Sequence, residues 1–107
     1  MLIYKYILKR DTGEQRIEMP RVCVPLSFGL DPQGQLCVWV LVNTDQPKAF
    51  AGTCDNPAIE HRFFVGFTGE AGPELPLDML RRNGCFLGTV NDHGLMRHGF
   101  HLGPVST

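Results

Sequence analysis

Three arginines and one phenylalanine of this chain could together bind an anionic ligand. Arg62 shares strand parity with Phe64 within an apolar segment, and Arg81 and Arg82 lie together near the end of an expected helix. Taken singly, each arginine is typical of a solvated charge or of a partner for the helix dipole. Taken together, the four residues predict a ligand-binding site, in which guanidinium groups hold a phosphate and the ring stacks on a base.

The glycine-rich stretch TGEAG, Thr68–Gly72, follows the Arg62 segment and raises the alternative of a phosphate-binding loop. It lacks both the G-x-x-x-x-G-K-[ST] pattern of nucleotide hydrolases and the G-x-G-x-x-G pattern of dinucleotide sites. Exposed amides of such a loop can still hold an anion, but Glu70 and Glu74 would oppose it. We therefore interpret the stretch as a structural corner that delivers the chain into the helix, beside the arginine site.

The histidines and cysteines give no signature of catalysis or of metal binding. His98 and His101 lie three apart on an expected strand, so they should face opposite sides. Neither C-x-x-C nor H-E-x-x-H is present, which argues against zinc. Asp92 and His93 are neighbours in an expected tight turn, where adjacent residues rarely orient one another as a triad requires. We expect half-buried or surface histidines, reduced buried cysteines, no cofactor and no enzymatic activity.

Composition and charge exclude several classes of protein. The chain has 107 residues with 43% hydrophobic and 20% charged, so one globular domain over residues 1–107 is expected. Its net charge of −1 gives no electrostatic grip on a nucleic acid polymer. The longest apolar run, LCVWVLV, is too short to span a membrane, and the opening residues do not resemble a signal peptide. Four widely spaced cysteines agree with a cytosolic protein.

Alternating and apolar segments predict about seven strands and one short helix. The expected strands are 2–9, 16–19, 22–30, 36–42, 60–67, 85–91 and 95–102, and the expected helix is 75–84. Pro25 suggests an edge or a bulge, and a long irregular connection is expected at 43–58. The fold class is therefore mainly β, as an antiparallel sandwich or open barrel.

The segment LCVWVLV, Leu36–Val42, is apolar on both parities and should be the central strand, buried on both faces. Trp39 would be its largest core anchor. Its expected neighbours are Leu41, Phe63, Phe86 and Phe100.

Short motifs along most of the chain resemble a family of small bacteriophage and prophage proteins known only as a domain of unknown function. They are the opening IYKY, IEMP at Ile17–Pro20, LCVWVLV, the strand Arg62–Phe67 that runs into TG, and the closing FLGTV and HGFHL. The resemblance implies a small phage accessory protein in the host cytoplasm. It supplies no biochemical activity.

These observations predict a protein that works by binding, without catalysis. The first hypothesis is sequestration of a small anionic ligand, such as a nucleotide signal used by host immunity. The alternative is an inhibitor that covers a surface of a host defence or metabolic protein. We also expect a homo-oligomer, because at least one open sheet edge should pair with another copy.

Overall fold

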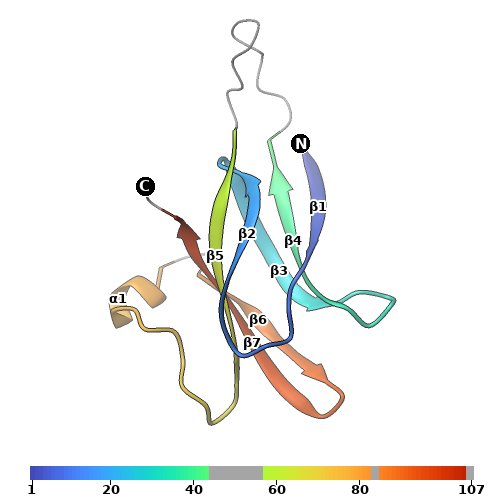
Figure 1. Cartoon of the computed structure of the whole chain (residues 1–107), viewed down its shortest axis with the longest axis vertical. Helices are drawn as coiled ribbons and strands as arrows, with labels where there is room; N and C mark the ends of the chain where they lie inside the picture. The colour runs from blue at the N-terminus through green and yellow to red at the C-terminus, as the bar shows by residue number, and fades with distance from the viewer. Residues whose placement is uncertain (44–56, 83–84, 106–107) are drawn as a thin grey trace, which may run out of the picture.

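Seven antiparallel strands form two sheets that pack face to face (Figure 1). The computed structural model of the chain describes residues 1–43, 57–82 and 85–105. Sheet A has the order β1–β4–β3 and sheet B the order β2–β5–β7–β6. The elements are β1 Leu2–Ile7, β2 Gly13–Pro20, β3 Cys23–Leu30, β4 Leu36–Val42, β5 Ala58–Phe67, α1 Leu77–Leu80, β6 Phe86–Asp92 and β7 Leu95–Pro104. The predicted mainly β, sandwich-like architecture is confirmed, and the described strands do not close into a barrel.

Several local predictions are also confirmed. The apolar segment 36–42 is the central strand of sheet A, between β1 and β3. Pro25 lies in the edge strand β3 beside a bulge, as expected of a residue that cannot donate to the ladder. The hairpin of β6 and β7 turns at His93, whose φ is +56°. Strand β2 is longer than predicted and covers Gly13–Pro20. It pairs with β5 along this whole length, and its polar side chains alternate outward. Most of the predicted connection 43–58 lies outside the described residues.

The core fills the space between the two sheets. Strand β4 contributes its even-numbered side chains, and β5 contributes Phe63 and Val65, of which Phe63 is only 1% exposed. Phe28 of β3 crosses to sheet B and lies against Gly99 of β7. A side chain at position 99 would meet the Phe28 ring, since a Cβ built there lies 2.5 Å from Phe28 Cγ. Glycine at this position is therefore what lets the two sheets approach.

The predicted role of Trp39 is wrong. Trp39 pairs with Lys5 and Ser27 on the outer face of sheet A, where it is half-buried and lies over Gly29. The inner face of β4 carries the smaller valines instead. Of the expected neighbours, Phe63 lies in the core, and Phe86 and Phe100 pair on the outer face of sheet B. The sequence of a strand that is apolar on both parities does not indicate which face turns inward. In β4 the large Trp39 side chain lies on the outer face.

The TGEAG stretch turns the chain, as the corner interpretation predicts. Glu70 N–H donates to Phe67 O across the turn, and Gly69 takes a φ of +87°, which a glycine adopts without strain. The chain then reaches α1, which lies to one side of the strands in Figure 1. The helix is shorter than predicted. None of the helices in the described ranges is long and apolar enough to cross a bilayer.

Candidate functional site

The predicted residues Arg62 and Phe64 do line one cleft, but its charge does not favour an anion. Both side chains stand on the outer face of β5, and the cleft continues along Gly72 and Glu74 of the following loop. The Nε of Arg62 donates to the Glu14 carboxylate of the neighbouring strand β2. With Glu74 beside this ion pair, the cleft holds two carboxylates and one guanidinium. We call it the Arg62 cleft; its volume is about 450 Å³.

The two remaining predicted residues lie elsewhere. Arg81 is exposed at the C-terminal end of α1, and its backbone N–H donates to Leu77 O. Arg82 follows it and lines a second cleft, between β3, α1 and β7. The structure thus pairs Arg62 with Phe64 and places Arg82 in different surroundings. Sequence parity correctly joined the first two but gave no information on where the helix would dock.

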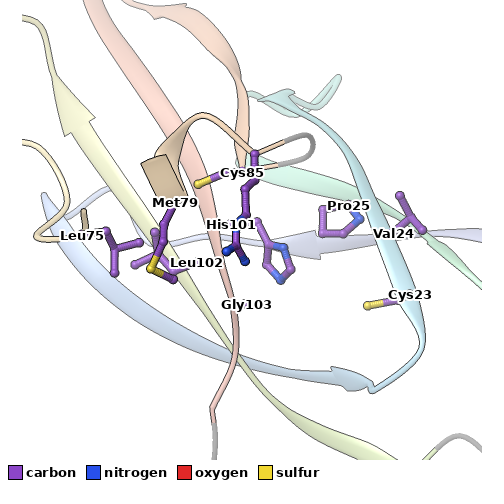
Figure 2. A pocket seen from close by; sticks show the side chains of 10 residues that line it. Cys23, Val24, Pro25, Leu75, Met79, Cys85, His101, Leu102 and Gly103 are labelled. Atoms are coloured by element: carbon purple, nitrogen blue, oxygen red, sulfur yellow. The ribbon is translucent and has the colours of Figure 1, made fainter. Parts of the chain in front are cut away.

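The second cleft, which we call the histidine cleft, has a volume of about 320 Å³. In Figure 2 the β3 residues lie on one side, Leu75 and Met79 on the other, and His101 between them. Its walls are largely apolar, and two thiols contribute to them. It is lined by Cys23, Val24, Pro25, Leu75, Met79, Arg82, Cys85, His101, Leu102 and Gly103. Among these described lining residues there is no carboxylate.

His101 is one member of a directly hydrogen-bonded imidazole pair. Its Nε2 lies 3.1 Å from Nδ1 of His61, a residue of β5 that is 2% exposed. The Nε2 of His61 lies 3.2 Å from Pro20 O and 3.9 Å from Cys23 Sγ. A carbonyl oxygen only accepts, so His61 carries its proton on Nε2 and its Nδ1 accepts from His101. The rings also stack, with centroids 5.3 Å apart.

This assignment leaves a lone pair on Nδ1 of His101. No described group hydrogen-bonds to that atom, and no buried side-chain nitrogen of the described residues lacks a partner. Because His101 lines the histidine cleft, we infer that its Nδ1 is available there as an acceptor. Burial, and then repulsion from His61, lower the pKa of His101 to about 4, so the ring is neutral at pH 7. Burial likewise lowers the pKa of His61.

Asp92, which was predicted only as a residue of a tight turn, belongs with Arg97 to a buried ion network at the other end of β7. Asp92 is 3% exposed and Arg97 6%. The Asp92 carboxylate accepts from Arg97 Nε at 2.6 Å, from Arg10 Nε at 2.8 Å and from His93 Nδ1 at 2.8 Å. The Arg97 guanidinium lies 4.4 Å from the centroid of the Phe67 ring. The nearby arginines, Arg10 foremost, hold the pKa of Asp92 far below its usual range.

Every buried side-chain nitrogen and oxygen of this network has a partner, which is typical of a structural role. Arg97 Nη1 also donates to Arg10 O at 2.6 Å, so the β1–β2 corner is fastened to the β6–β7 hairpin. Sequence reasoning missed the network and the buried His61. Strand parity carried a signal for both. His61 lies on the same face of its strand as Phe63 and Val65, and Arg97 lies on the same face as Gly99 and His101.

His98 faces outward from β7, opposite to His101, as predicted. Its two ring nitrogens lie 2.7 Å from Thr68 Oγ1 and 2.8 Å from Thr89 Oγ1. No carboxylate orients this imidazole within the described residues, so the arrangement lacks the third group of a nucleophilic triad. No set of three or more His, Cys, Asp and Glu side chains in the described ranges is placed to hold a metal ion. Cys23, Cys37 and Cys85 are free thiols, and Cys54 lies outside the described residues.

The fold and its clefts define a small two-sheet β protein with open, partly apolar clefts beside its second sheet. Residues 1–105 match the family described as a domain of unknown function, DUF7352, and the chain belongs to this family. No curated protein and no solved structure gives a significant match. The membership agrees with the predicted relation to an uncharacterised family, and it names no activity.

Proposed function

We propose that this protein acts by binding a small anionic ligand in the histidine cleft. The observation that carries the proposal is the balance of charge in the two clefts. In the histidine cleft, Arg82 is a cation with no carboxylate among the described lining residues, whereas Arg62 is bound to Glu14 and lies near Glu74. An anion gains most from a guanidinium that no other carboxylate already holds. Of the four residues predicted from the sequence, Arg82 is therefore the principal ligand contact.

The rest of the cleft limits the chemistry of the ligand. The open Nδ1 of His101 accepts a hydrogen bond, so the ligand carries a donor as well as a negative charge. Leu75, Met79 and Pro25 offer apolar surface to a flat or hydrocarbon part. The volume, about 320 Å³, lies near the lower limit for ligand pockets of roughly 300–1,000 Å³. A mononucleotide has all three parts: a phosphate, a planar base and N–H donors on that base.

The resemblance of the sequence to phage proteins of unknown function supports a role for such binding during infection, although it names no activity. We place the protein in the host cytoplasm as a phage accessory protein that sequesters a nucleotide signal of host immunity. In this proposal the protein holds the ligand and does not transform it. Its action is therefore stoichiometric, and its effectiveness depends on its abundance relative to the ligand.

Calorimetric titration with mononucleotides and cyclic nucleotides tests this proposal, with the matching nucleosides and inorganic phosphate as partial ligands. We expect the nucleotide to bind more tightly than either part alone. Replacing Arg82 by glutamine removes a charged hydrogen bond worth ~1.5–3 kcal/mol, so affinity should fall about tenfold to a hundredfold. The control is Arg62→Gln, which removes the same charge from the other cleft and should change affinity less than about twofold.

Two results would contradict the proposal. If Arg62→Gln abolishes binding and Arg82→Gln does not, the ligand occupies the Arg62 cleft and the acidic side chains there do not repel it. If no nucleotide, nucleoside or phosphate binds the folded protein at millimolar concentration, the anionic ligand class is wrong. His101→Phe adds a finer test, because it removes the acceptor and should weaken a nucleotide more than it weakens phosphate.

A further inference from the structure

The two sheets together have four edges, and three of them carry the devices by which proteins prevent strands of other molecules from pairing. Strand β3 has Pro25 and a bulge beside it, and β6 has a bulge between Phe86 and Gly88. Strand β2 alternates outward charges and ends at a proline. Its outward charges are Glu14, Arg16 and Glu18.

The fourth edge, β1, has none of these devices. It contains neither proline nor glycine, and it pairs with β4 in regular register from Leu2 to Ile7. Its apolar side chains are exposed on both faces: Ile3 is 60% exposed and Ile7 48% on the outer face, and Leu2 52% and Tyr4 39% on the inner face. Such an edge is a template for another strand.

The single charged residue of β1 does not protect the edge, because its charge is compensated inside the molecule. Lys5 Nζ donates to Asp31 Oδ2 at 2.9 Å, and the Asp31 side chain is fully buried. The same carboxylate accepts from the backbone N–H groups of Gln33 and Gln35, which fixes it in place. The edge therefore carries no net charge and does not select a partner of opposite charge, although two lysine ammonium groups brought directly opposite each other would still repel.

The direction of the backbone groups along β1 follows from one hydrogen bond. Leu8 N–H donates to Leu36 O of β4 at 2.8 Å. Because backbone groups alternate in direction along a strand, the even-numbered residues face β4, and the N–H and C=O groups of Ile3, Lys5 and Ile7 point to the open side. In the described part of the chain no strand pairs with that side.

We propose that β1 pairs antiparallel with β1 of a second copy of this chain, across a two-fold axis, which joins two A sheets into one of six strands. A two-fold axis normal to the sheet places a strand antiparallel to its own copy and keeps both inner faces on the same side. A net charge of −1 for each chain offers little repulsion between the copies. The assembly uses sheet A only and is independent of the ligand proposed for the histidine cleft.

The side chains favour one register. If Lys5 lay on the axis, it would stand directly opposite its own copy, and like charges in that position destabilise a sheet. If Tyr4 lies on the axis, Ile3 stands opposite Lys5 of the copy, and Leu2 opposite Tyr6. The second register also brings two tyrosine rings together on the inner face, where aromatic pairs stabilise a sheet. We therefore infer the register centred on Tyr4.

Sedimentation equilibrium of the full chain tests the pairing. We expect a mass about twice the 12.0 kDa of one chain. Ile3→Pro removes a backbone donor from the open side, and Ile3→Lys places a second lysine opposite Lys5. Either change should raise the dimer dissociation constant at least tenfold while circular dichroism shows a folded protein. The control Val24→Lys charges the exposed outer face of sheet A at its other edge, and should leave the dimer intact.

Disulfide trapping tests the register. Tyr4→Cys should form a covalent dimer on oxidation, because only a residue on the axis meets its own copy at disulfide distance. Lys5→Cys should not, and the unmodified chain gives the background from the native thiols. A wild-type protein that stays monomeric at all concentrations overturns the proposal. So does a dimer that Val24→Lys breaks and Ile3→Lys leaves intact, since the copies then stack by their faces.

Discussion

Strand β7 buries polar groups at two places, and the two places differ in what they leave open. At one, Arg97 donates to Asp92, whose carboxylate accepts two further side chains, and the charges compensate one another. At the other, His61 and His101 share one hydrogen bond without any charge, and the second ring keeps an open acceptor. Between them Gly99 receives the Phe28 ring.

Structural and ligand-binding polar groups can be separated by their hydrogen-bond partners. Burial alone does not distinguish the two clusters, because Asp92 is 3% exposed in one and His61 is 2% exposed in the other. The difference is whether all hydrogen-bonding atoms have partners. A fully engaged network holds the fold together, whereas an open acceptor beside an apolar cleft is available to a ligand.

The largest effect should follow from breaking the engaged network. Arg97→Leu leaves the buried Asp92 carboxylate with its exposed partners only, and removal of one member of a buried ion pair costs about 3–5 kcal/mol of unfolding free energy. Urea denaturation measures this loss. The control Arg16→Gln breaks an exposed pair with Glu60, whose two side chains are each 54% exposed, and should cost less than about 1 kcal/mol. Equal losses of unfolding free energy in the two variants would show that the buried network stabilises the fold no more than an exposed ion pair does.

A smaller effect should appear as a pH dependence of stability between pH 7 and pH 4 that comes mainly from the imidazole pair. The folded-state pKa of His101, about 4, lies below the unfolded value of 6.5, so the unfolded chain binds the proton first. The stability that the neutral ring contributes is present above pH 6.5 and is lost as the pH falls towards 4, at no more than ~1.4 kcal/mol per pH unit for each proton. The pKa values of Asp92 and Asp31 are also lowered in the folded state, so their contribution to stability is lost mainly below the unfolded value of 3.8, at and beneath the lower end of this window.

Thermal denaturation between pH 7 and pH 4 measures this dependence. The matched variant is His101→Gln, which keeps a donor for His61 but does not titrate. Its melting temperature should fall less steeply with acid than that of the wild type. Superimposed curves would mean that His101 does not contribute to the acid sensitivity.

The smallest effect should come from the third partner of Asp92. The side chain of His93 is 82% exposed, so its contact with the carboxylate is well screened by solvent. Asparagine tolerates the positive φ of this position. We expect His93→Asn to change the unfolding free energy by less than about 1 kcal/mol in urea denaturation at pH 7. A loss as large as that of Arg97→Leu would mean that His93, and not the buried arginine, fixes Asp92.

Much of the fold was predictable because turn residues and apolar runs act locally. Gly69 in the turn that follows β5, the tight turn at His93 and the apolar run of β4 each determine their own segment. The inward face of β4 was not predictable, because valine and tryptophan both have a high propensity for β-strands. Only packing against sheet B determines which of them faces the core. When neither set of alternate residues in a strand is polar, the sequence does not indicate which side of the strand is buried.

The candidate site was predictable only in part, for a related reason. Parity correctly placed Arg62 beside Phe64, because that relation is local. The ion pair of Arg62 with Glu14 joins strands that are distant in sequence, as does the bond between Arg10 and Asp92, which are 82 positions apart. Such pairings depend on strand order, which no single segment encodes. The docking of α1, which brings Arg82 to the histidine cleft, depends on it as well.

The contact of Phe28 with Gly99 also bears on how the chain folds. Of the described strand pairs, only β3–β4 and β6–β7 join consecutive strands through short turns; the others close long loops. Long-range pairing slows folding, and two-state β domains of this kind fold in milliseconds to seconds. The two local hairpins should form first, and Phe28 and Gly99 belong one to each. We expect their meeting to be the step at which two independent pieces of chain become one folding nucleus, to which β1, β2 and β5 then add.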